Sequence, residues 1–194
     1  MKKRIEFIDF EEFKDLYKKC NNKELKLVIA LGFGSGLRIS EILGYKRQKR
    51  QKKNKQTGKI EFIKDDSEIP PLTPDKFDLK KHQITLDDTK GKKWRIVPCS
   101  PLIKPEHLKM LPLKVKRRTL QYQFKAHAKK ILNKNISIHI LRHGFGNYLI
   151  NVKKIPITMV QGMMGHSSVS VTGVYAKANP TESINEAWKA MGGE

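Results

Sequence analysis

The hydrophobic pattern of this chain changes its period twice, and this change restricts the possible folds more than any other feature. Up to about residue 45, and again from about residue 115, apolar residues recur at the spacing of amphipathic helices. Between His82 and Pro98 they alternate instead, as in a half-buried β-hairpin. A length of 194 residues is typical of one domain. The sequence therefore predicts a mostly α protein with a small antiparallel β-sheet, in the α+β class.

Local signals predict where the helices begin and end. Asp9 and Glu12 have the spacing of a capping box, which marks the start of the first helix. A second helix is expected from about residue 23, and a short third helix is expected with Ser40 as its cap. Three glycines are expected to end the second helix: Gly32, Gly34 and Gly36. Further helices are expected over residues 115–132, 139–151, 156–164, 168–175 and 181–191.

The alternating segment predicts the two strands of the hairpin. Ile84 and Leu86 mark the first strand, and the second strand is marked by Trp94, Ile96 and Pro98. The tip is expected around residues 89–93.

The C-terminal segment carries an amphipathic stripe. Its apolar residues follow the spacing i, i+3, i+4 and i+7: Ile184, Ala187, Trp188 and Met191. Such a helix packs either on its own domain or on a neighbouring protomer, and the spacing favours neither.

The charge of the chain indicates its class of partner. Forty Lys and Arg residues against nineteen Asp and Glu residues leave a formal charge of +21, which favours nucleic acid ahead of a membrane surface. Eight of the fourteen residues from 46 to 59 are basic, and none is acidic. We interpret the region near 46–77 as an inserted basic loop that is either simply solvated or in contact with DNA.

Export and membrane insertion are not expected. The longest apolar stretch, residues 27–34, is too short to span a bilayer, and the N-terminus lacks the pattern of a signal peptide. Cys20 and Cys99 cannot form a disulfide framework and have no CxxC partner, which favours a reducing compartment. An intracellular location, cytoplasmic or nucleoid-associated, is therefore expected.

The segment around residue 140 carries the first candidate site. His139 and Arg142 are three residues apart, so on a helix they are neighbours that can contact the same anion. A competing hypothesis is metal binding by His139 and His143 at i and i+4. A zinc hydrolase helix of this type has Glu after its first His, whereas Ile140 follows here, so no metal is predicted.

Four separated motifs occur in a set order: residues 35–43, 90–98, 139–143 and 165–175. Together they resemble the catalytic domain of the tyrosine recombinases, the family of phage integrases and Xer-type resolvases. The resemblance covers most of the chain. It implies six catalytic residues: Arg38, Lys90, His139, Arg142, His166 and Tyr175.

The resemblance implies a role for each of these residues. Tyr175 attacks phosphorus and forms a 3′-phosphotyrosyl bond, so neither a cofactor nor ATP is needed. The arginines stabilise the charged transition state. His139 is the candidate base, and His166 bonds a non-bridging oxygen. Lys90 is the candidate acid, with Lys92 and Lys93 as alternatives for that role.

The expected partner is double-stranded DNA. Strand exchange in this family requires several protomers on two DNA sites, so a tetramer on DNA is expected. In free solution a monomer is the default expectation. Compared with this family, residues 1–194 are expected to form a single catalytic domain, without the usual N-terminal domain that clamps DNA. Basic residues outside the catalytic set are expected to contact the phosphate backbone: Lys92, Lys93, Arg117, Arg118 and Lys153.

Three alternatives to a recombinase remain open. The same chemistry without a second duplex gives a type IB topoisomerase-like enzyme that nicks and relaxes DNA. A non-catalytic DNA-binding module would keep the fold without needing a positioned phenol. A metal-dependent nuclease needs a carboxylate cluster, and the Asp65–Asp66 and Asp87–Asp88 pairs lie in expected loop or hairpin segments.

Overall fold

The computed structural model describes residues 8–46, 50–53, 60–63, 68–88, 93–165 and 180–193. Its helices are α1 (Phe10–Lys18), α2 (Lys23–Gly34), α3 (Ile39–Leu43), α4 (Pro105–Leu108), α5 (Arg117–Leu132), α6 (His139–Asn147), α7 (Ile157–Met164) and α8 (Pro180–Ala190). A 3₁₀ turn spans Pro74–Lys76, and a π-helical turn at Tyr148–Val152 extends α6. The strands are β1 (Tyr45–Lys46), β2 (Arg50–Lys53), β3 (Ile60–Ile63), β4 (Glu68–Ile69), β5 (Phe77–Asp78), β6 (Gln83–Asp88) and β7 (Lys93–Pro98).

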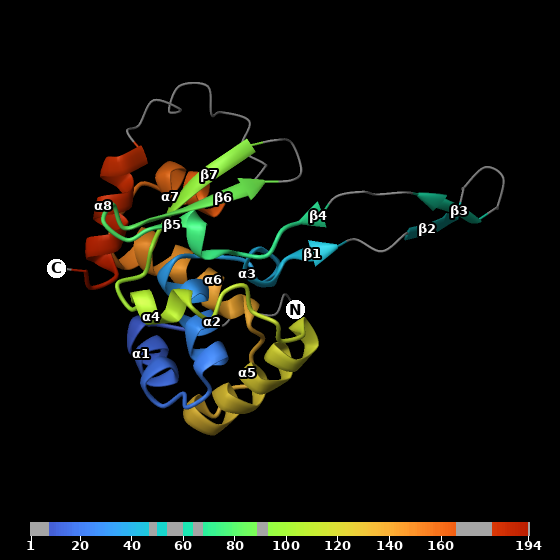
Figure 1. Cartoon of the computed structure of the whole chain (residues 1–194). Helices are drawn as coiled ribbons and strands as arrows, with labels where there is room; N and C mark the ends of the chain where they lie inside the picture. The colour runs from blue at the N-terminus through green and yellow to red at the C-terminus, as the bar shows by residue number, and fades with distance from the viewer. Residues whose placement is uncertain are drawn as a thin grey trace, which may run out of the picture.

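The elements form a helical body with a small sheet on one side (Figure 1). Helix α2 packs against α1, α5 and α6, while α7 and α8 contact strand β7. The sheet has the antiparallel order β5-β6-β7. The mostly α fold with a small antiparallel sheet is thus confirmed. No helix within the described ranges is long and apolar enough to cross a membrane.

The expected start of α1 is confirmed. The Glu12 amide donates to Asp9 Oδ1 at 2.8 Å, and the Asp9 amide donates to Glu12 Oε2 at 3.2 Å. These bonds satisfy amides that the first turn of a helix leaves without partners. The cap directs Phe13 and Leu16 into the core.

The expected end of α2 is wrong, because the helix continues through Gly32 and Gly34. These glycines serve close packing instead of helix termination. A Cβ at Gly32 would lie 3.0 Å from the Leu141 side chain of α6, and one at Gly34 would lie 2.3 Å from Ser100 Oγ. Glycine at these two positions therefore allows Leu141 and Ser100 to approach the backbone of α2 closely.

The turn after α2 requires glycine at position 36. Gly36 has φ of +68°, and a Cβ there would lie 2.6 Å from the Phe145 ring. We expect Gly36→Ala to destabilise the fold by about 1–3 kcal/mol in urea unfolding, because strain and overpacking act together.

Gly162 provides the matched control for this substitution. It lies inside α7, and no described atom is within 4 Å of where its Cβ would be. Gly162→Ala should therefore stabilise the protein by roughly 0.5–1 kcal/mol. Equal effects of the two substitutions would contradict this description of the turn.

The hairpin is confirmed, with its tip at residues 89–92 outside the described residues. The pattern did not show which face of the second strand is buried. Ile84 pairs with Val97, Leu86 pairs with Arg95, and cross-strand partners share a face. Val97 is buried and the Arg95 side chain is 13% exposed, whereas Trp94 is 66% exposed. The register, not the apolar content, decides which face is inward.

The region expected to be a basic loop contains paired strands. Strand β1 pairs with β4, and β2 pairs with β3, all antiparallel. Figure 1 shows β2 and β3 as a ribbon well away from the helical body. We call strands β1 to β4 the basic arm.

The amphipathic C-terminal helix packs on its own domain. Ile184, Ala187 and Met191 are buried, and the Trp188 ring stacks on His82 with centroids 3.7 Å apart. The helix expected over 168–175 lies outside the described residues.

Candidate active site

Arg38 stands at the start of helix α3. The sequence predicted Ser40 as the cap of this helix, but Arg38 occupies the N-cap position. The Arg38 amide donates to Glu41 Oε2 at 2.7 Å, so the Glu41 carboxylate satisfies the helix start from within the first turn. The Arg38 guanidinium donates to Glu41 Oε1 at 2.8 Å. Glu41 thus orients both the backbone and the side chain of Arg38.

Arg142 reaches the same region from helix α6, where it is buried. Its Nη1 donates to the Gly36 carbonyl at 2.6 Å, and its Nη2 donates to the Met164 carbonyl. Its Nη1 also lies 3.9 Å from Glu41 Oε2. Arg142 therefore connects the turn before α3 to the end of α7, and it shares a carboxylate with Arg38.

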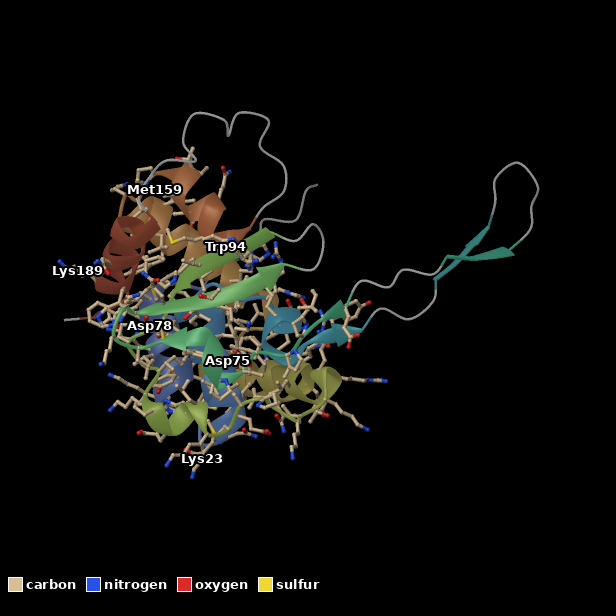
Figure 2. All side chains as sticks on the ribbon, turned by 45° about the horizontal axis from the view of Figure 1, so that its top comes forward. Lys23, Asp75, Asp78, Trp94, Met159 and Lys189 are labelled. Atoms are coloured by element: carbon tan, nitrogen blue, oxygen red, sulfur yellow. The ribbon has the colours of Figure 1, made fainter. Side chains whose placement is uncertain are left out.

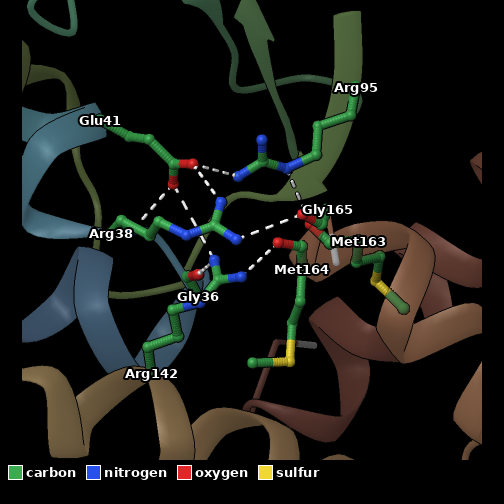
Figure 3. Close-up of polar contacts among 8 residues, drawn as sticks. All are labelled: Gly36, Arg38, Glu41, Arg95, Arg142, Met163, Met164 and Gly165. Atoms are coloured by element: carbon green, nitrogen blue, oxygen red, sulfur yellow. Dashed lines mark hydrogen bonds and ion pairs between the residues drawn. The ribbon is translucent and has the colours of Figure 1, made fainter. Parts of the chain in front are cut away.

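Arg95 is a third arginine of this cluster, and the sequence analysis missed it. From strand β7, its Nη2 donates to Glu41 Oε1 at 2.6 Å and its Nε donates to the Met163 carbonyl at 3.0 Å. The signal that could have identified Arg95 is the register of the hairpin, which pairs Arg95 with the buried Leu86. Glu41 contacts all three arginines (Figure 3).

The Glu41 carboxylate is the electrostatic centre of the cluster. Burial by itself raises the pKa of Glu41, but the charges and hydrogen bonds of Arg95 and Arg38 hold that pKa below its usual value. Glu41 is therefore ionised at neutral pH. Three guanidinium groups around one carboxylate leave a local excess of positive charge, which favours binding of an anion.

The arginines also bind the last carbonyls of α7. Arg38 Nη2 donates to the Gly165 carbonyl at 3.2 Å, next to the carbonyls of Met163 and Met164 that Arg95 and Arg142 bind. Cations are favourable at the negative end of a helix dipole. Gly165 closes the helix with φ of +61°, as a left-handed C-cap requires. The cluster thus holds the residue that precedes His166.

His139 stands at the start of α6 beside this cluster, and its side chain is exposed. Desolvation lowers the pKa of His139, and the charges of nearby groups lower it further: Arg117, His143, Arg142 and Arg38. The imidazole is therefore neutral at pH 7 and able to accept a proton. Burial, and then the charge of Arg38, lower the pKa of Arg142 to about 9, so this guanidinium stays protonated.

Arg117 is the first of the charged groups that act on His139. We expect Arg117→Gln to raise the pKa of His139, because the substitution removes a positive charge that disfavours the imidazolium form. An NMR titration of the imidazole measures this shift. Arg118→Gln, which removes an exposed charge from the next position of α5, should leave the titration nearly unchanged. Equal shifts in both variants would contradict the placement of Arg117.

The structure brings together only some of the residues that the sequence singled out. Arg38, His139, Arg142 and Arg117 lie in one region, whereas Arg118 is exposed on α5 and Lys153 Nζ lies 5.6 Å from the Tyr148 ring. Lys93 begins strand β7. Four residues lie outside the described residues: Lys90, Lys92, His166 and Tyr175. Within the described ranges, no three His, Cys, Asp or Glu side chains are grouped as a metal site requires.

Known proteins resemble this chain along most of its length. It is 24% identical over 188 residues to the tyrosine recombinase XerA of Pyrococcus horikoshii, covering 91% of this chain and 58% of that protein. It is also 24% identical over 197 residues to XerA of Saccharolobus solfataricus, covering 98% of this chain and 58% of that protein. The chain thus spans less than two thirds of these relatives.

Solved structures share the fold. The integrase from mycobacterium phage Brujita superposes with a TM-score of 0.57 at 18% identity, covering 96% of this chain and 56% of that one. A crystal structure of XerA recombinase superposes with a TM-score of 0.57 at 19% identity. The match covers 97% of this chain and 66% of that chain. The model of the phage integrase family matches residues 6–182. The resemblance inferred from the four motifs is confirmed, and the chain belongs to the phage integrase family.

Proposed function

We propose that this chain is the catalytic domain of a site-specific DNA recombinase, which breaks and rejoins DNA through a 3′-phosphotyrosyl intermediate. One observation carries the proposal. Arg38 and Arg142 come from different helices and are held on one carboxylate, with His139 beside them. The names of the XerA relatives agree with this activity.

The arginine cluster suits a reacting phosphodiester. Charge spreads over the non-bridging oxygens in the transition state, and fixed cations aimed at those oxygens lower the barrier. A guanidinium has five N–H donors, of which Arg38 uses two on Glu41 and Gly165. Since other groups already fix its orientation, Arg38 is preorganised to bind a phosphate oxygen.

The remaining roles complete a transesterification without a cofactor. Tyr175 attacks phosphorus, its proton passes to neutral His139, and the 5′-oxygen leaves with a proton from Lys90. His166 follows the capped end of α7 directly and bonds a non-bridging oxygen. Rejoining reverses these steps with a 5′-hydroxyl as nucleophile. We further propose that four protomers assemble on two DNA duplexes from free monomers.

Covalent capture tests the proposed function. The protein is mixed with nicked duplex substrates that carry candidate sites, in the presence of EDTA, and resolved in SDS. We expect an SDS-resistant protein–DNA adduct that Tyr175→Phe abolishes. Tyr122→Phe, on the exposed outer face of α5, is the matched control and should keep the adduct. An adduct that persists in Tyr175→Phe, or cleavage only with a divalent metal, would overturn the proposal.

A further inference from the structure

The basic arm is the largest feature that the proposed function leaves unused. Residues 46–69 contain nine Lys and Arg residues against four Asp and Glu residues. Three of the four residues of β2 are basic: Arg50, Lys52 and Lys53. A strand of this composition has no apolar residue to bury, so its own packing does not explain why it is there.

The root of the arm is closely packed against the body. Gly44, directly after α3, has φ of +75°, and a Cβ there would lie 2.8 Å from the Pro71 nitrogen. The Leu72 amide donates to the Ile42 carbonyl at 3.2 Å. The chain thus leaves and re-enters the body beside α3, the helix that begins at Arg38. The position of the root, strands β1 and β4, is therefore tied to the position of Arg38.

The root also adjoins the active site. The Arg117 guanidinium carbon lies 5.9 Å from the centroid of the Tyr45 ring in β1. Arg117 is at the same time the first of the charged groups that lower the pKa of His139. Arg117 therefore carries positive charge from the neighbourhood of His139 to Tyr45 in the root of the arm. A polyanion bound at the cluster would extend along this path.

We infer that the basic arm binds the DNA duplex that flanks the phosphate held by Arg38 and Arg142. This inference rests on the proposed function. A two-stranded antiparallel ribbon has the dimensions to enter the major groove of DNA. Its Lys and Arg residues contact phosphates, which supplies affinity and positions the duplex without reading its sequence. The arm thus lengthens the DNA-binding surface beyond the helical body.

The test is the salt dependence of DNA binding. The test compares the wild type with the triple variant Arg50→Gln, Lys52→Gln and Lys53→Gln. Fluorescence anisotropy with a long duplex measures the affinity of each protein at several salt concentrations, and the slope of log affinity against log salt is compared. Each lost phosphate contact should reduce the slope by about 0.9, or about 2.7 for three contacts. Between 50 and 200 mM salt, wild-type affinity should therefore fall about 40-fold more than that of the variant.

Two matched variants separate a local role from bulk charge. The charge-retaining triple variant Arg50→Lys, Lys52→Arg and Lys53→Arg should keep the wild-type slope. Lys18→Gln, Lys23→Gln and Lys189→Gln remove three exposed charges from the body, and should change the slope far less. Figure 2 shows Lys23 and Lys189 away from the β2–β3 ribbon.

The outcomes distinguish the arm from the proposed function. If the glutamine arm variant and the body variant have the same slope, the inference about the arm is overturned. If the wild-type chain itself shows no salt-dependent binding to duplex DNA, the proposed function fails. Urea unfolding of the glutamine arm variant should match that of the wild type, which shows that a changed slope does not come from unfolding.

Discussion

Arg142→Gln is expected to lower the rate of DNA cleavage by about 10²–10³-fold, the loss typical of removing one preorganised donor to a charged transition state. The substitution removes a guanidinium that is 7% exposed and bonded to the Gly36 and Met164 carbonyls. Single-turnover adduct formation on a nicked substrate, at saturating protein, measures the chemical step without the contribution of DNA affinity.

Comparison with Arg38→Gln separates an effect on the cleavage rate from an effect on the stability of the fold. The Arg38 side chain is 35% exposed, so its loss should cost less stability than the loss of Arg142, while cleavage falls by a similar factor. Urea unfolding of both variants provides the comparison. Arg118→Gln, which removes an exposed charge, should cleave at nearly the wild-type rate. Wild-type cleavage by Arg38→Gln would show that the cluster is structural and not catalytic.

Glu41→Gln is expected to destabilise the fold by about 3–5 kcal/mol at pH 7, because it removes one partner from a buried ion-pair network. The Glu41 side chain is 9% exposed and lies against three guanidinium groups. Without the carboxylate, these charges repel one another in a largely desolvated site. Glu11→Gln, where the side chain is 78% exposed, should change the stability by less than about 0.5 kcal/mol.

The effect of Glu41→Gln should also depend on pH. The pKa of Glu41 is lower in the folded protein than in the unfolded chain, so ionised Glu41 stabilises the fold above the ordinary glutamate pKa. This stabilisation is lost as the pH falls below that value and through the lower folded pKa. The difference between wild type and variant, measured by urea unfolding, should therefore be constant near neutral pH and shrink in acid. A difference that does not change with pH would contradict the ionised state of Glu41.

The sequence predicted the local placement of part of the candidate site because some signals are local. The three-residue spacing of His139 and Arg142 defines one helix face, and the motif around Arg38 precedes a short helix. Arg95 was missed because a strand pattern does not reveal which face is inward. In β7 the residues with more apolar character, Trp94 and Ile96, lie on the more exposed face.

Other parts of the fold depend on contacts that are distant in sequence. Gly32 and Gly34 have the composition of a helix end, but they lie inside α2, where Leu141 and Ser100 pack closely against them. The central place of Glu41 depends on α3, α6 and β7 meeting at one point. The pairing of the basic arm depends on cross-strand register, which a run of charged residues does not specify.

Peptide mapping of the captured adduct identifies the nucleophile among the five tyrosines of the chain. After digestion of protein and DNA, mass spectrometry locates the residual phosphonucleotide. Tyr148 is buried against Phe10, whereas Tyr45 is 41% exposed beside Arg117 and is the informative alternative. We expect the label on Tyr175 alone. A label on Tyr45, or on any residue other than Tyr175, would contradict the assignment of the nucleophile and with it the proposed mechanism.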